Sequence, residues 1–169
     1  MRKTDEITNS EDLIDSRSID ERVDELRDTI ESTAQPYLDT LKEEDADFER
    51  EASKADEISD ALAEWLNNPS KGQFPSISDI EDIEAEISEY ALLKALQDEG
   101  QGYSEWKYGM TLIRDSYFEE YAQQFAEDIG AIKETSEWPC DCIDWERAAR
   151  ELQMDYSAIE FDGVTYWMR

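Results

Sequence analysis

The chain has 169 residues, of which 45 are Asp or Glu, 16 are Lys or Arg and none is His, so its formal net charge is −29. This excess of acid excludes proteins that hold nucleic acid or anionic membranes through clustered bases. The five Trp, eight Tyr and five Phe indicate a folded chain and not a disordered acidic tail. No apolar run is long enough to span a membrane and residues 1–10 lack the apolar core of a signal peptide, so we expect a soluble, cytoplasmic protein.

Residues 1–16 are polar and show no hydrophobic period, which predicts a flexible acidic arm. A first helix should follow, because apolar residues recur there at spacings of four, three and four, namely Ile19, Val23, Leu26 and Ile30. Ser18 and Glu21 have the spacing of a capping box at its start. Pro36 should break or kink this helix, or lie in the first turn of the next one.

A second predicted helix carries a similar stripe, made up of Phe48, Ala52, Ala55, Ile58, Leu62 and Trp65. Neither stripe is wide enough to form a core alone, so the two helices should pair as a hairpin or a long coiled coil. A linker near 67–76 precedes a third helix, whose stripe consists of Ile80, Ile83, Ile87, Tyr90 and Leu93. Ser78 and Glu81 again fit a capping box, and the glycines at 100 and 102 should end this helix. We therefore assign residues 17–99 to one helical region.

From residue 100 onward the predicted elements are shorter. Asp115 or Ser116 should begin a helix that ends near Gly130, and Asp144 is placed as the N-cap of a short helix over 145–152. Two β-favouring runs on either side of Asp162-Gly163 predict a hairpin. The expected fold is mostly α, with an N-terminal helical hairpin or coiled coil plus a helix, followed by a small α+β module over 100–169 that ends in a β-hairpin. Trp65, Tyr121 and Trp145 should belong to the core.

The sequence does not predict an enzyme. Without His, catalytic triads lack their usual base, and neither a phosphate-binding glycine loop nor a nucleophile elbow is present. The many carboxylates always offer pairs, so no single pair indicates catalysis, and residues 155–163 do not provide an EF-hand loop. Cys140 and Cys142 form a C-x-C without a second cysteine pair, which indicates reduced thiols and not a zinc site. We expect no cofactor and no metal.

The informative feature is the placement of acids on helices that are already amphipathic. Residues 72–93 contain no Lys or Arg, and residues 43–64 contain ten acids against Arg50 and Lys54. Like charges at i and i+4 destabilise a helix by a few tenths of a kcal/mol, so selection for stability alone would have added lysines. The predicted partner-binding surface consists of Glu43, Glu44, Asp45, Asp47, Glu49, Asp56, Glu57, Asp60, Glu64, Asp79, Glu81, Asp82, Glu84, Glu86, Glu89, Glu119, Glu120, Glu127 and Asp128.

Acids at these spacings can imitate the phosphates of a nucleic acid. Helix residues three or four apart are separated by about 4.5–6 Å along the axis, which is of the order of the phosphate spacing along a strand. Duplex DNA carries about one charge per 1.7 Å, so 29 net charges correspond to at most roughly 14 base pairs. A rod of carboxylates could thus enter a DNA-binding groove and displace the counterions that DNA would have displaced.

The C-terminal third carries Phe118-Glu119-Glu120-Tyr121-Ala122, Ala126-Glu127-Asp128-Ile129-Gly130, the segment 143–152 and Asp155-Tyr156. On these residues, the stretch from residue 100 to 169 resembles the last domain of ArdA-type antirestriction proteins. The resemblance implies an elongated, dimeric DNA mimic, encoded by a phage or another mobile element, that blocks type I restriction-modification complexes in a bacterial host cell. Residues 17–99 depart from that family, because they indicate a helical hairpin and a further helix.

The sequence therefore predicts a DNA-mimic inhibitor that occupies the groove of a basic DNA- or RNA-binding complex of host defence, either a type I restriction-modification complex or a CRISPR-Cas effector. We expect it to bind neither nucleic acid nor membrane directly, and a homodimer formed through the N-terminal helices is possible. The first alternative is an acidic coiled-coil adaptor or transcriptional co-regulator that is not a DNA mimic. The second is a carboxylate-based metal enzyme.

Overall fold

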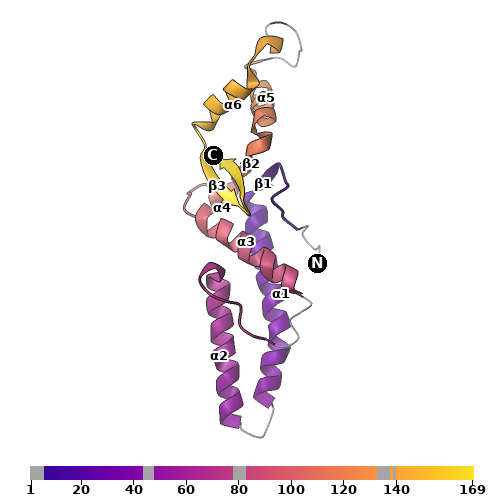
Figure 1. Cartoon of the computed structure of the whole chain (residues 1–169), viewed down its shortest axis with the longest axis vertical. Coiled ribbons are helices and arrows are strands. Elements are labelled where there is room, and N and C mark those ends of the chain that lie inside the picture. Colours follow the sequence, from indigo (N-terminus) through magenta and orange to yellow (C-terminus); the bar gives the residue numbers. More distant parts are fainter. Residues whose placement is uncertain (1–5, 44–47, 78–82, 133–137, 139) are drawn as a thin grey trace. The chain divides into compact units, whose positions relative to one another are not determined.

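The structure is a computed structural model that describes residues 6–43, 48–77, 83–132, 138 and 140–169. Two compact units divide the chain: a helical unit that contains Ile19–Glu99, and a sheet unit that contains Ile7–Ser18 and Gly100–Arg169. Most of the described residues are helical, and a small antiparallel sheet lies in the sheet unit (Figure 1). The predicted fold class, mostly α with a C-terminal α+β module, is therefore confirmed.

The described elements, in chain order, are β1 (Leu13–Asp15), α1 (Ser16–Glu43), α2 (Phe48–Asn67), the 3-10 turn η1 (Pro69–Lys71), α3 (Glu84–Gly100), α4 (Trp106–Gly109), β2 (Thr111–Arg114), the 3-10 turn η3 (Asp115–Tyr117), α5 (Phe118–Asp128), the 3-10 turn η4 (Cys140–Cys142), α6 (Trp145–Gln153), β3 (Ser157–Phe161) and β4 (Val164–Met168). The predicted capping box at Ser78 and Glu81 lies outside the described residues.

Helix α1 begins at Ser16, so the capping box predicted at Ser18 is wrong. The N-cap is Asp15, whose carboxylate accepts a hydrogen bond from the backbone amide of Arg17 at 2.9 Å. The same carboxylate accepts hydrogen bonds from the Arg17 guanidinium, and these lower the pKa of Asp15. A β-strand that ends in Asp thus passes directly into the helix.

Pro36 lies inside α1, so the break predicted at this residue is wrong. A proline inside a helix removes one backbone hydrogen bond and costs about 3 kcal/mol. Pro36 is exposed, whereas Ala34, Leu38 and Leu41 continue the buried stripe of α1 past it. Burial of one Leu contributes about 1.5–3 kcal/mol, so the two leucines beyond Pro36 offset its cost and the helix continues.

The core of the helical unit combines the stripes of α1, α2 and α3. Helix α2 runs antiparallel to α1, since Lys42 near the end of α1 lies 4.0 Å from Asp56 and Arg27 reaches the other end of α2 (Figure 1). Trp65 is 5% exposed, and its ring lies 5.5 Å from the ring of Tyr90 on α3. This confirms Trp65 as a core residue.

The sheet unit holds four antiparallel strands in the order β1-β2-β4-β3. Asp162 and Gly163, with φ of +45° and +74°, form the two-residue turn between β3 and β4, so the predicted hairpin is confirmed. The strands β1 and β2 were not predicted. They pair through Leu13↔Ile113 and Ile14↔Leu112, and β2 also pairs with β4.

The flexible arm predicted over 1–16 is wrong for its described part. Residues 13–15 form β1, and Ile7 and Ile14 are buried. The Oη of Tyr166 on β4 donates a hydrogen bond to the carbonyl of Glu11 at 2.8 Å. A three-residue strand is too short to show an alternating pattern, which is why the sequence indicated a loose segment.

Helices α5 and α6 pack together, and α5 contacts β2 in the sheet. Their shared core contains Ile113, Phe118, Ala122 and Ala149, with Tyr121, Tyr156 and Trp167 packed against it. Asp144 caps α6 by accepting the Arg147 amide at 3.0 Å, as predicted. Gly130, with φ of +71°, follows the end of α5. Trp145 is only half-buried, so its assignment to the core holds in part.

Trp106 contacts Gly100, the last residue of α3, and Ser16, the first residue of α1. It is 2% exposed, and its ring lies against the Cα of Gly100 so closely that a Cβ at position 100 would overlap the ring. The Ser16 hydroxyl donates a hydrogen bond to the carbonyl of Trp106 at 2.7 Å. The oxygen of the same hydroxyl accepts a hydrogen bond from the backbone amide of Met110 at 2.7 Å. Glycine at position 100 is therefore required by contact with the indole.

We predict that Gly100→Ala lowers the free energy of unfolding by about 1–3 kcal/mol, because Trp106 is enclosed and cannot move away from the new methyl group. Urea denaturation followed by circular dichroism measures the change. Gly72→Ala is the matched control. Its backbone is extended (φ −135°, ψ +169°) and its new Cβ would meet only Trp65 Cδ1 at 4.0 Å, so it should stabilise by about 0.4–1 kcal/mol. Equal effects of the two substitutions would contradict the close contact.

Candidate functional site

Two basic side chains of α1, Arg22 and Arg27, are turned toward the other helices of the helical unit, whereas Arg17 at the start of α1 is exposed. Arg22 is 6% exposed, and Arg27 is half-buried. The exposed charged residues between positions 19 and 31 are Glu21, Asp24, Asp28 and Glu31. The charged residues of this segment that are fully exposed are therefore all acidic.

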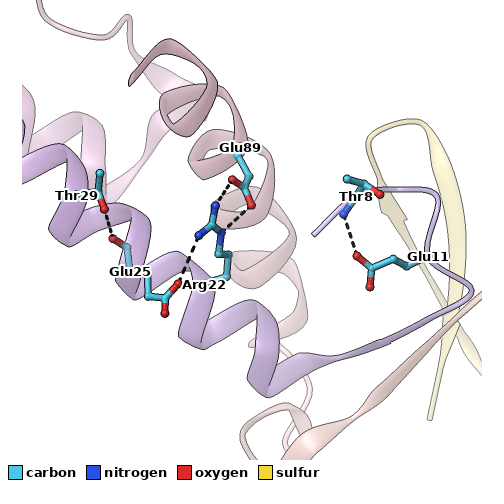
Figure 2. Close-up of polar contacts among 6 residues, drawn as sticks. All are labelled: Thr8, Glu11, Arg22, Glu25, Thr29 and Glu89. Carbon is cyan, nitrogen blue, oxygen red and sulfur yellow. Dashed lines mark hydrogen bonds and ion pairs between the residues drawn. The ribbon is translucent and has the colours of Figure 1, made fainter. Parts of the chain in front are cut away.

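Arg22 forms a two-point ion pair with Glu89 of α3 (Figure 2). Its Nε donates to Glu89 Oε1 at 2.8 Å, and its Nη2 donates to Glu89 Oε2 at 2.6 Å. Its Nη1 also reaches Glu25 Oε2 at 3.4 Å. The hydrogen bonds to Glu89 raise the pKa of Arg22 above its usual value despite burial. The Arg22 and Glu89 side chains are only 7% and 11% exposed, so this pair belongs to the interior.

Arg27 and Tyr90 both bind the carbonyl of Leu66 at the C-terminal end of α2. The Nη2 of Arg27 donates to this oxygen at 3.1 Å, and the Oη of Tyr90 donates to it as well. Burial raises the pKa of Tyr90. A cation is favourable at a helix C-terminus, where carbonyl groups carry partial negative charge. One oxygen atom thus joins α1, α2 and α3.

We call Glu21, Asp24, Asp28 and Glu31 the α1 acidic stripe, because they follow one another at spacings of three, four and three on the solvent face of α1. This stripe is not among the acidic residues predicted from the sequence. The available signal was the position of Arg22 directly beside Val23, at the edge of the buried stripe of α1.

On α2, the predicted residues Asp56, Glu57, Asp60 and Glu64 are all exposed and share the face opposite Leu62 and Trp65. We call these four residues the α2 acidic stripe. Glu43 and Glu49 lie in helices, but their side chains are not described, and Glu44, Asp45 and Asp47 lie outside the described residues. The described part of the predicted surface on α2 therefore forms one continuous row.

The predicted acids near α3 do not form such a row within the described residues. Glu84 is exposed and Glu86 is half-buried. Glu89 was predicted to face a partner, but its carboxylate faces Arg22 inside the unit, and this placement corrects the prediction. Asp79, Glu81 and Asp82 lie outside the described residues.

The two outer helices of the sheet unit differ in their charge pattern. Glu119, Glu120, Glu127 and Asp128 of α5 are all exposed, as a solvent-facing surface requires. On α6, by contrast, Arg150 pairs with Glu146 at 2.8 Å and Arg147 pairs with Glu151 at 3.2 Å. Local pairing on α6 leaves α5 as the helix of this unit that presents acid alone.

The described residues offer little support for a metal site, a cysteine-based site or a membrane-spanning helix. They contain no group of three or more Cys, Asp or Glu arranged to hold a metal ion. Cys140 is half-buried and Cys142 is exposed, and both are free thiols. Among the helices that the structure describes, none is long and apolar enough to cross a membrane. The distinctive surfaces of this protein are its acidic rows.

Comparisons with protein-family models, with curated proteins and with solved structures find no match to this chain. The similarity of residues 100–169 to the ArdA-type module therefore stays a prediction from the sequence.

We predict that Arg22→Met lowers the free energy of unfolding by about 3 kcal/mol, because it removes both hydrogen bonds from a largely buried Glu89 carboxylate. Urea denaturation measures this loss. The double variant Arg22→Met/Glu89→Gln should recover more than half of it, since no buried charge is left. Arg150→Met, which breaks an ion pair whose side chains are 62% and 72% exposed, is the control and should cost less than about 1 kcal/mol. A loss no larger than that control would contradict the interior role of Arg22.

Proposed function

We propose that the protein is a DNA-mimic inhibitor, encoded by a phage or another mobile element, that occupies the nucleic-acid-binding groove of a bacterial defence complex. The observation that carries the proposal is the segregation of charge on α1, where Arg22 and Arg27 point inward and the α1 acidic stripe points outward. The target is a type I restriction-modification complex or a CRISPR-Cas effector, so the activity is antirestriction or anti-CRISPR.

A DNA-binding groove would attract a row of carboxylates that no neighbouring base neutralises. Neighbouring acids of the α1 stripe are separated by about 4.5 or 6 Å along the helix axis, close to the spacing of phosphates on a strand. Lys and Arg of a DNA-binding groove attract such a row over a Debye length of about 10 Å at 0.1 M salt. Bases beside the row would weaken this attraction, and the two arginines nearest to it, Arg22 and Arg27, are instead turned toward α2 and α3.

Inhibition of this kind needs no chemical step. The acidic rows neutralise the groove, its bound counterions are released, and DNA is excluded as long as the complex persists. Binding is therefore stoichiometric and depends on many carboxylates, each of which contributes little. The α2 acidic stripe supplies a second row, and the exposed acids of α5 add further negative charge in the sheet unit.

An adaptor or transcriptional co-regulator is the alternative function, and it would bind through apolar contacts. Exposed apolar side chains favour it at single positions: Trp138 is 81% exposed, Met154 is 82% exposed and Ile129 is 61% exposed. Binding through these side chains would tolerate salt, whereas binding through the acidic rows would weaken steeply as salt is added.

We predict that neutralising the α1 acidic stripe (Glu21→Gln, Asp24→Asn, Asp28→Asn and Glu31→Gln together) weakens inhibition of DNA binding by at least tenfold, because the phosphate-like row is lost. The measurement is competition with duplex DNA for a type I restriction complex and for a Cas effector, at two salt concentrations. The same variant should be more stable at low salt by about 1 kcal/mol, because three like-charged neighbour pairs are removed.

A control with the same change in net charge replaces the exposed acids Glu146, Glu151, Asp155 and Glu160 of the sheet unit by their amides. It should retain most of the inhibition, since these residues lie off the rows described above. If both variants inhibit equally well, the α1 stripe is not the contact surface. Competition that is insensitive to salt would favour the adaptor.

A further inference from the structure

Strand β3 is an open edge of the sheet. It is the last strand in the order β1-β2-β4-β3, and among the described strands it pairs only with β4. The other edge strand, β1, has three residues and passes directly into α1, whereas β3 has five. An edge strand of this length presents a ladder of backbone groups with which another chain can pair.

The turn between β3 and β4 determines which backbone groups of β3 point outward. Because this turn has two residues, Phe161 beside it is hydrogen-bonded to β4. Such bonding recurs at every second residue of an antiparallel pair, so Ile159 is bonded to β4 as well. The N–H and C=O groups of Ala158 and Glu160 therefore point away from β4, toward the open side of the strand.

These outward groups of Ala158 and Glu160 are accessible. Both residues are exposed, and within the described part of the chain no hydrogen bond reaches their outward groups. Edge strands are commonly blocked by a lysine, a proline or a bulge. Residues 157–161 contain neither lysine nor proline, and their register with residues 164–168 is continuous. The edge is therefore open to a further strand.

The charge along this edge determines which kind of strand it attracts. Glu160 is exposed and forms no ion pair with a described residue, and Asp162 in the adjoining turn is exposed too. Residues 151–168 contain no Lys or Arg. The guanidinium of Arg169 lies 6.0 Å from the ring centre of Tyr156, which precedes the opposite end of β3 from Glu160. The end of the edge at Glu160 therefore attracts a basic strand and repels an acidic one.

A second copy of this chain does not fit the edge. It would bring its own Glu160 and Asp162 close to the same residues, and each copy carries a net charge of −29. Like charges opposite one another on paired strands are destabilising, whereas opposite charges are favourable. Directly opposite residues have Cβ atoms about 4.5–5.5 Å apart, so a lysine or arginine opposite Glu160 reaches its carboxylate.

We propose that an extended, basic segment of a protein partner adds to the sheet as a fifth strand beside β3. Its backbone pairs with Ala158 and Glu160 in the antiparallel sense of the other pairs in this sheet, and a lysine or arginine lies opposite Glu160. Main-chain hydrogen bonds supply affinity, and alternate side chains supply specificity. This inference goes beyond the proposed function and does not rest on it, because β3 lies off the acidic rows.

The probe is a short peptide of alternating lysine and threonine, titrated into the full-length protein. With the peptide in excess, hydrogen exchange followed by NMR should slow about tenfold at the amides of Ala158 and Glu160, because these amides gain a partner. The amides of Ile159 and Phe161 already bond to β4 and serve as the internal reference, which should change less. No binding, or unchanged exchange at Ala158 and Glu160, would overturn the proposal.

Methylated peptides separate strand pairing from general attraction to an acidic protein. In the proposed register the lysine N–H groups face β3, because the lysines lie opposite Ala158 and Glu160. The peptide N-methylated at its lysines keeps its charge but loses these donors, so it should bind about tenfold more weakly. The peptide N-methylated at its threonines should still bind, and a peptide of glutamate and threonine should not. Equal binding of the two methylated peptides, or binding of the acidic one, would contradict the fifth strand.

Two pairs of variants test the same edge from the side of the protein. Ala158→Pro removes an outward N–H and should weaken binding about tenfold, whereas Ala158→Val keeps it and should bind as the natural chain does. Glu160→Gln should weaken binding by more than Glu119→Gln, which neutralises an exposed acid of α5. Equal effects within either pair would overturn the proposal. Circular dichroism checks the fold of Ala158→Pro, and the methylated peptides decide the matter if that variant does not fold.

Discussion

Two inward-pointing arginines are the constraint on which the helical unit and its surface both depend. Arg22 binds Glu89, and Arg27 shares the carbonyl of Leu66 with Tyr90, so the three helices are joined through guanidinium groups. The like-charged neighbours of the α1 stripe cost a few tenths of a kcal/mol per pair. Each buried Leu or Ile of α1 contributes about 1.5–3 kcal/mol, so the core tolerates the repulsion on its outer face. A stable interior is therefore compatible with an uninterrupted row of exposed acids on α1.

The charge pattern differs from one helix to the next. On α6, acids and arginines pair on the surface, which is the usual arrangement for a soluble helix. Between residues 19 and 31 of α1, Arg22 and Arg27 are buried or half-buried and the exposed charged residues are all acids. The net charge of the chain does not distinguish these two arrangements, because both contain Glu and Arg a few residues apart. The two arrangements differ in where the arginine side chains point. On α6 they pair with acids at the surface, whereas Arg22 and Arg27 of α1 bind groups of the other helices.

Much of the fold could be predicted from local patterns. The Asp162-Gly163 turn needs two positive φ angles that these residues accept, and Asp144 has the side chain that an N-cap requires, so both were found. The helix through Pro36 and the strand β1 could not be found locally. The helix continues through Pro36 because Leu38 and Leu41 beyond it are buried. Strand β1 forms because Leu13 pairs with Ile113, a hundred residues away.

The candidate site was predictable only in part. The exposed acids of α2 and α5 follow from helical periodicity, because a polar residue opposite an apolar stripe faces solvent. Glu89 has the same spacing as its neighbours, yet its partner Arg22 lies far away in the sequence. The inward direction of Arg22 and Arg27 likewise depends on distant partners, Glu89 and the carbonyl of Leu66. Contacts between distant segments therefore determine which carboxylates are available.

The sheet unit is made from two separate parts of the chain, and the helical unit is inserted between them. This has a consequence for synthesis on the ribosome. Strand β1 emerges early but has to wait for its neighbour β2, which begins at Thr111. All residues of the helical unit emerge during that interval. The segments of all three helices are therefore synthesised before the first strand can pair, so the sheet forms only after the whole helical insert has been made.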